Sequence, residues 1–268
     1  MRYAVLAASN FLGTSNQLAG CINDLINVKA LIEPSGIKIL AELRDHDMTA
    51  VNWKSALQLA ALTAVEGDII FHAHSHHGAQ IRDSKEPDGL DECWCADGFD
   101  WSPESMITDK WMFQLISSLK TGVLWVDLCD ACHAGDSLRQ MWCPKEKPRY
   151  IPNPDISLET KLSRYVDKDI IHTLKPMVIE GEDRKGILLA ACRSNQTSAD
   201  ANINGKACGA FTNYLLQSIS ETPKASYESL MLRTTELLGL GGYDQKPEID
   251  CLPLDIQRTW NMDIMGQS

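Results

Sequence analysis

A chain of 268 residues, 44% hydrophobic and 23% charged, has the composition of an ordinary globular protein and can bury a substantial core. Its net charge of −11 argues against nucleic acid or an anionic membrane as the main partner and suits a basic peptide. The odd count of nine cysteines, the lack of a secretory leader and the lack of an apolar run of the roughly 20 residues that a membrane span needs predict a cytoplasmic protein with mostly free thiols.

The first half of the chain alternates between apolar strand patterns and helical patterns. The stretch 83–103 is rich in Gly, Pro and Asp, has no periodicity and is predicted to form a long loop. The alternation predicts an α/β fold with a mostly parallel sheet and helices on both faces. Strands are predicted at 2–8, 37–43, 68–74 and 123–128, and helices at 18–33, 49–65 and 103–119.

A change of composition separates the two halves. Residues 139–185 carry several prolines among charged residues and are predicted to form a linker or insertion. Beyond it, the patterns predict a strand at 186–192, helices at 207–220 and 227–238, and an edge strand within 247–254. The chain is therefore predicted to be a single domain made of residues 1–138, a linker 139–185 and residues 186–268.

Two predicted strands deliver reactive side chains just past their carboxyl ends. His77 and Gly78 follow the third strand, and Cys132 follows the fourth within the small polar turn 130–135. Ligand sites of open α/β sheets lie at such strand ends, and a neighbouring imidazole can activate a thiol. The pattern predicts a cysteine hydrolase with Cys132 exposed at the sheet rim as nucleophile and His77 as base. Gly78 permits the close approach that an oxyanion hole of backbone amides needs.

The same residue types also have plainer roles. A lone cysteine is more often a small buried hydrophobe, the role predicted for Cys129. Alternation along a strand places His72, His74 and His76 on one face and His77 on the other, with packing or hydrogen bonding as their default role. A zinc-dependent hydrolase using His72, His74, His76 and His77 is an alternative, because the run resembles the His-x-His-x-Asp-His string of metallo-β-lactamase-like enzymes. That string's Asp is absent here, and the alternative leaves Cys132 unexplained.

Two carboxylates complete the candidate site. Asp130 lies two residues before Cys132, and Asp24 lies on the first predicted helix within Gly-Cys-Ile-Asn-Asp. A solvated polar helix face is the plainer role for Asp24.

Seven short motifs run in order along the chain. Together they resemble the motifs of the caspase-like cysteine peptidases, and within them the metacaspases. The chain matches the family string His-Ser-Gly-His-Gly except that His76 replaces the first Gly. It matches the string Asp-x-Cys-His-Ser-Gly except that Ala134 replaces the Ser. The motifs are Gly-Cys-Ile-Asn-Asp (20–24), His-Ser-His-His-Gly (74–78), Asp-Gly-Leu-Asp-Glu (88–92), Asp-Ala-Cys-His-Ala-Gly (130–135), Ala-Ala-Cys-Arg-Ser-Asn-Gln-Thr-Ser-Ala-Asp (190–200), Gly-Ala-Phe-Thr (209–212) and Gln-Lys-Pro-Glu (245–248).

The resemblance implies a caspase–hemoglobinase-like fold with large-subunit-like and small-subunit-like parts on either side of the linker. It implies a cysteine endopeptidase with a Cys132/His77 dyad and the amides of Gly78 and Cys132 as the oxyanion hole. It also implies that Asp24 and Asp130 line the S1 pocket, which holds P1, the residue before the cut bond. The expected substrates are proteins or peptides with Arg or Lys at P1, because two desolvated carboxylates favour a cation.

The chain departs from the family at one further place. Metacaspases often carry an adjacent pair of Asp residues that serves calcium, whereas here Lys110 follows Asp109. No metal is therefore expected to be required for the chemistry, and only weak calcium binding is expected. A catalytically silent caspase-like regulatory protein is the remaining alternative, against which the intact dyad argues. Self-cleavage is predicted within 139–185, where the basic residues Lys145, Lys147, Arg149, Lys161, Arg164 and Lys168 are expected to be exposed.

Overall fold

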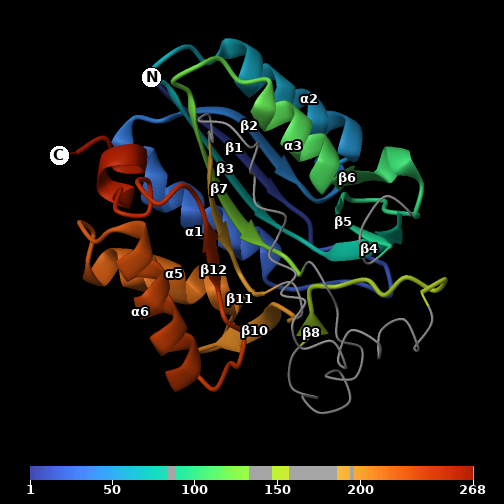
Figure 1. Ribbon diagram of the computed structural model, residues 1–268. Coiled ribbons are helices and arrows are strands. Elements are labelled where there is room, and N and C mark those ends of the chain that lie inside the picture. Colours follow the sequence, from blue (N-terminus) through green and yellow to red (C-terminus); the bar gives the residue numbers. More distant parts are fainter. Residues whose placement is uncertain (84–88, 133–146, 157–185, 194–195, 268) are drawn as a thin grey trace.

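A six-stranded sheet forms the centre of the computed structural model, which describes residues 1–83, 89–132, 147–156, 186–193 and 196–267 (Figure 1). Five strands are parallel, and the edge strand β12 runs antiparallel to its neighbour β9. The α/β fold with a mostly parallel sheet is therefore confirmed. The strand order is β12 (Glu248–Asp250), β9 (Gly186–Ala190), β7 (Leu124–Asp130), β3 (Ile69–Ser75), β1 (Arg2–Ala8) and β2 (Lys38–Arg44).

Helices cover both faces of this sheet, as the alternating pattern predicted. Figure 1 shows α2 (Ala50–Thr63) and α3 (Asp109–Ser117) on one face, and α1 (Cys21–Ile32), α5 (Ala210–Glu221) and α6 (Tyr227–Leu240) on the other. Each face has its own apolar core, one around Trp53 and Trp125 and the other around Phe71 and Phe211. A π-helical turn, Asn261–Met265, follows near the end of the chain.

Strand β3 brings the candidate site residues to one edge of the sheet. It lies between β1 and β7, and its last residue Ser75 pairs with Asp130, the last residue of β7. Because both strands are parallel and in register, His77 and Cys132 leave the sheet at neighbouring positions. The carboxyl edge of the sheet therefore carries the predicted site.

A small antiparallel sheet corrects the prediction of a long loop at 83–103. It consists of β4 (Gly78–Arg82), β5 (Leu90–Cys95) and β6 (Met106–Thr108). The helix predicted from 103 begins at Asp109, because residues 106–108 pair with β5 and Thr108 caps α3 by accepting the Trp111 N–H at 3.2 Å. The alternation in β5 was too short to detect without its partners.

A second small sheet carries part of the predicted linker. It contains β8 (Lys147–Pro148), β10 (Ala199–Ile203) and β11 (Lys206–Gly209), all antiparallel. The start predicted for the 207–220 helix is wrong, since its first residues pair with β10 before α5 begins. The expected exposure of Arg149 is also wrong, because this side chain is 0% exposed. The other predicted linker residues, 139–146 and 157–185, lie outside the described residues, and the division of the chain into three parts stays a prediction.

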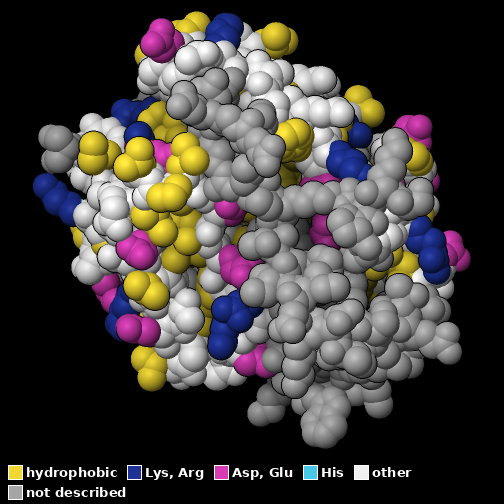
Figure 2. Space-filling model, viewed as in Figure 1, with side chains coloured by type: hydrophobic (Ala, Val, Ile, Leu, Met, Phe, Trp, Pro, Cys, Tyr) yellow, Lys and Arg dark blue, Asp and Glu magenta, His cyan; other side chains and the backbone are white. Residues whose placement is uncertain are grey.

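Charged side chains of both signs lie on the face of the molecule seen in Figure 2. On the face in Figure 2, the Lys and Arg side chains of the described residues lie scattered among acidic and uncharged ones. Among the helices of the described part of the chain, none combines the length and apolar character needed to cross a membrane.

Candidate active site

The predicted nucleophile and base lie on backbone segments that touch each other. A Cβ atom added to Gly78 would lie 1.6 Å from the carbonyl oxygen of Cys132, so only glycine fits at this position. Cys132 is fully buried rather than exposed at the rim as predicted. Its Sγ accepts the Ser198 N–H at 2.7 Å, and its own N–H donates to the Arg149 carbonyl, so residues from the predicted linker and from the segment beyond it cover the thiol.

The His77 ring is oriented by a backbone carbonyl. Its Nε2 lies 2.6 Å from Asn16 O, and since a carbonyl only accepts, Nε2 carries the proton. Its Nδ1 is buried and has no hydrogen-bond partner among the described residues. Burial, together with the nearby charges of Lys147 and Arg149, lowers the pKa of His77 to about 4 despite the bond to Asn16. The ring is therefore neutral at pH 7, with a free lone pair on Nδ1.

A row of stacked histidines supports the His77 backbone from the other face. The rings of His72, His74 and His76 stack at 4.3 and 5.0 Å, as the strand alternation predicted. His74 Nε2 lies 2.7 Å from Asp127 Oδ1, His74 Nδ1 lies 2.7 Å from His76 Nε2, and His76 Nδ1 donates to His77 O at 2.7 Å. This chain of hydrogen bonds fixes the backbone turn that carries His77 and Gly78.

The same row bears on the zinc alternative. His72, His74 and Asp127 offer donor atoms within 4.8 Å of one another. Those atoms already bond each other, and His72 Nε2 accepts the Trp53 indole N–H at 3.0 Å. Burial acts to raise the pKa of Asp127, but His72 and His74 lower it by more. The net pKa lies below its usual range, so the carboxylate stays ionised. The geometry favours the packing and hydrogen-bonding role predicted as the default.

Both predicted oxyanion-hole amides point at one oxygen atom. Gly78 N–H donates to Arg149 O at 3.0 Å, and Cys132 N–H donates to the same oxygen at 3.2 Å. Two amides converging on a single carbonyl oxygen have the geometry of an oxyanion hole. Here its occupant is a peptide carbonyl of the chain itself.

The Arg149 side chain enters a pocket of three carboxylates. Its Nη2 lies 2.8 Å from Asp24 Oδ2 and 3.1 Å from Asp200 Oδ1, and its Nη1 lies 3.1 Å from Asp130 Oδ1. Nη1 also donates to Ser75 Oγ at 2.7 Å. The pocket thus contains both predicted substrate-binding residues, Asp24 and Asp130, together with a third acid that the sequence analysis missed.

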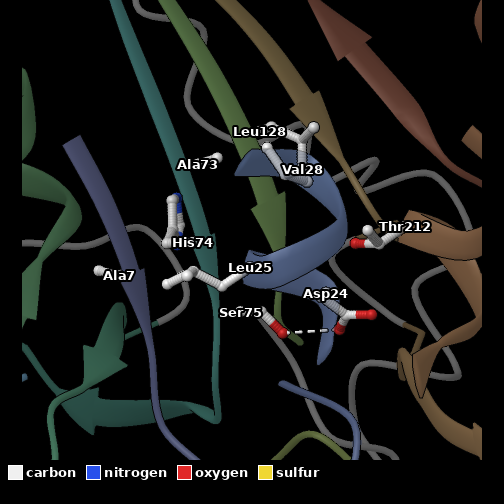
Figure 3. Close-up of a pocket in the computed structure, with 9 residues that line it drawn as sticks. All are labelled: Ala7, Asp24, Leu25, Val28, Ala73, His74, Ser75, Leu128 and Thr212. Carbon is white, nitrogen blue, oxygen red and sulfur yellow. Dashed lines mark hydrogen bonds between the residues drawn. The ribbon is translucent and has the colours of Figure 1, made fainter. Parts of the chain in front are cut away.

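Neighbouring polar groups hold the two predicted acids in place. Figure 3 shows Asp24 on α1 turned toward Ser75 at the end of β3, whose Oγ donates to it at 2.9 Å. Gly209 N–H donates to Asp24 Oδ1 at 2.8 Å. Asp130 accepts from Ser198 Oγ at 2.7 Å and from the Thr212 hydroxyl at 2.6 Å. Behind them, a small pocket lies between α1 and the sheet, lined mostly by apolar groups.

Asp200 and Gly209 are the pocket residues that the sequence analysis missed. Asp200 accepts the N–H groups of Ala19 and Gly20 at 2.7 and 2.9 Å. A Cβ on Gly209 would meet Asp130 Oδ2 at 2.1 Å and Arg149 Nη1 at 2.5 Å, so a glycine here leaves room for the guanidinium. Both residues belong to motifs of the small-subunit-like part, which was the available signal.

Burial makes the protonation of Asp24 sensitive to the occupant of this pocket. Burial raises the pKa of Asp24 to about 6, where Arg149 acts to lower it and Asp130 to raise it. For Arg149, burial lowers the pKa, but the surrounding carboxylates hold it well above its usual range. A cation in the pocket therefore keeps Asp24 ionised, and removing the cation favours its protonation.

The caspase domain family matches residues 1–256 of this sequence. The chain belongs to that family. It is similar to the Metacaspase-1 proteins of Yarrowia lipolytica (29% identical, 97% of this chain and 63% of that protein) and Schizosaccharomyces pombe (27% identical, 95% and 68%). The resemblance to metacaspases is thereby confirmed. The chain spans less than two thirds of the length of two of these relatives. It covers 63% of the Metacaspase-1 of Yarrowia lipolytica and 65% of that of Candida albicans.

Solved structures confirm the caspase-like fold. The chain resembles protein GSU0716 from Geobacter sulfurreducens with a TM-score of 0.70 and 24% identity, covering 96% of this chain and 97% of that one. It resembles Caspase-1 from Spodoptera frugiperda with a TM-score of 0.55 and 10% identity, covering 94% and 86%. At these identities the likeness concerns the fold alone.

A cluster of three acids lies beside a lysine, away from the candidate active site. Asp91, Glu92 and Asp109 offer carboxylate oxygens within 4.8 Å of one another, a donor type that suits calcium. The Lys110 ammonium contacts the Asp83 carboxylate and lies 3.5 Å from Asp91 Oδ2. The donor atoms are of the type that calcium prefers. The positive charge of Lys110 beside them opposes the binding of a divalent cation.

We expect activity that does not need calcium. Chelator-treated protein should cleave peptides, with at most modest stimulation at millimolar calcium, because affinity follows the charge of the ligand set. Lys110→Asp should bind calcium more tightly than the wild type, measured by calorimetry independently of activity. A wild type that is silent in chelator and restored by micromolar calcium would contradict this expectation.

Proposed function

We propose that this chain is a cysteine endopeptidase that cleaves after Arg or Lys with Cys132 as nucleophile and His77 as general base. The pose of Arg149 carries the proposal. Its carbonyl oxygen accepts the Gly78 and Cys132 amides while its guanidinium lies among three carboxylates. A P1 arginine of a substrate is held in this way when its carbonyl is positioned for attack.

The chemistry follows from the groups at the site. The proton of the Cys132 thiol passes to the free Nδ1 of His77, and the Ser198 N–H at 2.7 Å from Sγ can stabilise the thiolate. Sγ attacks the P1 carbonyl carbon, and the oxygen takes the negative charge between the two amides. His77 then gives its proton to the leaving amine, and a water molecule hydrolyses the thioester.

The pocket favours Arg over Lys. Arg149 uses both terminal nitrogens for five contacts with Asp24, Asp130, Asp200 and Ser75. A lysine ammonium is a single point charge and cannot make all five contacts at once. A panel of fluorogenic peptides that differ only at P1 tests the proposal. Cleavage should be fastest after Arg, slower after Lys and negligible after Asp or Leu; equal rates after Leu and Arg would refute the proposed specificity.

The pH dependence of KM provides a separate prediction. A P1 cation binds ionised Asp24, whose pKa is about 6 with Arg149 in place and higher without a cation. KM for Arg peptides should therefore be constant at high pH and rise as the pH falls through 6 or somewhat above. Rates measured between pH 5 and 8 check this, and Asp24→Asn should remove the rise. An unchanged KM down to pH 5 would contradict the role of Asp24.

A further inference from the structure

Residues 147–156 cross the candidate active site from one side to the other. Before Arg149, Pro148 and Lys147 pair antiparallel with Ala199 and Asp200 of β10. Arg149 N–H donates to Ser198 O at 3.0 Å, which continues that pairing up to the site. An extended peptide that adds a strand to an exposed sheet edge is a common mode of peptide recognition.

After Arg149 the segment follows strand β4. Tyr150 forms a parallel bridge with Gly78, and Ile151 N–H donates to Gly78 O at 2.9 Å. Asn153 donates to Gln80 O at 2.9 Å further along the strand. The segment is thus held on both sides of the bond between Arg149 and Tyr150, and that bond lies at the oxyanion hole.

We infer that residues 147–150 are an internal substrate and that the Arg149–Tyr150 peptide bond is the site of self-cleavage. The inference rests on the proposed function and specifies one of its substrates. Three contacts carry it together: the carbonyl in the oxyanion hole, the guanidinium among Asp24, Asp130 and Asp200, and the strand pairing with β10. Each alone has a structural explanation, whereas their combination on one residue is that of a P1 arginine.

The reaction is hydrolysis of one peptide bond. Cys132 Sγ bonds to the carbonyl carbon of Arg149, the C–N bond to Tyr150 breaks, and His77 gives the amine its proton. Water then releases a carboxylate at Arg149 and restores the thiol. Until the cut, the segment excludes other substrates from the pocket.

The two products should remain one folded unit. β7 belongs to the first product and β9 to the second, yet they are neighbours in the central sheet. Asp24 of the first product also accepts the Gly209 N–H of the second. Cleavage therefore opens the site without separating its halves.

The segment also indicates a preferred substrate sequence. Lys147, the P3 residue, donates through Nζ to Ser15 O at 3.1 Å and Gln17 O at 2.6 Å. These carbonyls flank Asn16, whose own carbonyl orients His77. A basic P3 residue therefore binds the loop that positions the base, and a Lys-Pro-Arg peptide should have a several-fold lower KM than Ala-Pro-Arg.

The test follows newly made protein over time by mass spectrometry. Wild type should yield a second chain beginning Tyr-Ile-Pro-Asn and a first chain ending in Arg149, at a rate independent of protein concentration. Cys132→Ala and Arg149→Gln should stay joined at this bond, and Arg149→Lys, which keeps a cation, should be cut more slowly. Lys161→Gln, which changes another basic residue of the predicted linker, is the matched control and should be cut like wild type.

The same samples are assayed on a fluorogenic Arg peptide, which separates the two proposals. Suppose that the wild-type chain cleaves the peptide but stays joined between residues 149 and 150. This result would refute the proposal of an internal substrate, whereas the proposed endopeptidase activity would be supported. Cutting of Arg149→Gln at this bond would refute the internal substrate as well. A protein that cleaves neither the peptide nor itself would overturn both.

Discussion

Replacing Cys132 or His77 by Ala should abolish peptide cleavage while leaving the fold intact. Loss of the nucleophile removes the bond-forming step of the proposed reaction, and loss of the base removes its proton transfer. We expect kcat/KM for an Arg peptide to fall by on the order of 10³-fold or more. The fold should persist because the central sheet and both apolar cores do not depend on either side chain.

Matched controls lie elsewhere in the chain. Cys251→Ala changes a partly buried thiol, and His46→Ala changes an exposed imidazole paired with Asp97. Both should keep wild-type kcat/KM, with folding of all four variants checked by circular dichroism and thermal unfolding. Full activity in Cys132→Ala, or activity lost only on removal of zinc, would refute the proposed Cys132/His77 dyad and favour the zinc hydrolase.

Substituting Asp24 or Asp130 by Asn should weaken Arg and Lys substrates selectively. Each carboxylate contacts the guanidinium in a pocket shielded from water, and removing one partner of a buried charged pair costs roughly 3–5 kcal/mol. Every 1.4 kcal/mol is about tenfold in affinity, so kcat/KM for Arg peptides should fall by about 10²-fold or more. The kinetics of Arg, Lys and Leu peptides measure the selectivity.

Asp263 offers a control of equal burial. This acid lies in the π-helical turn, outside the three-carboxylate pocket. It is 1% exposed and pairs with Arg258. Asp263→Asn should lower stability but leave the ratio of Arg to Leu cleavage unchanged. If the Asp24 and Asp130 variants lost activity equally on every peptide, the acids would be structural supports rather than the source of specificity.

The sequence by itself predicted the parallel sheet and the two strand ends at which the candidate site lies. Apolar runs are long and regular in β1, β3 and β7, and side-chain alternation separates His77 from His72, His74 and His76. Parallel strands end at the same edge, so placing Cys132 and His77 together needed only the pattern and the topology that it implies. The ordered motifs then predicted Asp24 and Asp130 as substrate-binding residues, and the structure brings both into contact with Arg149.

The tertiary structure alone decided what depends on partners far along the chain. Strands β5 and β6 are short and become recognisable only through their pairing with each other and with β4. Arg149 was expected in solvent because a basic residue in a Pro-rich stretch is usually exposed. It is buried because Asp24, Asp130 and Asp200, from three separate segments, converge on it and offset the cost of removing its charge from water. Local patterns report which face of an element is apolar, whereas the compensation of a buried charge is a property of the folded chain.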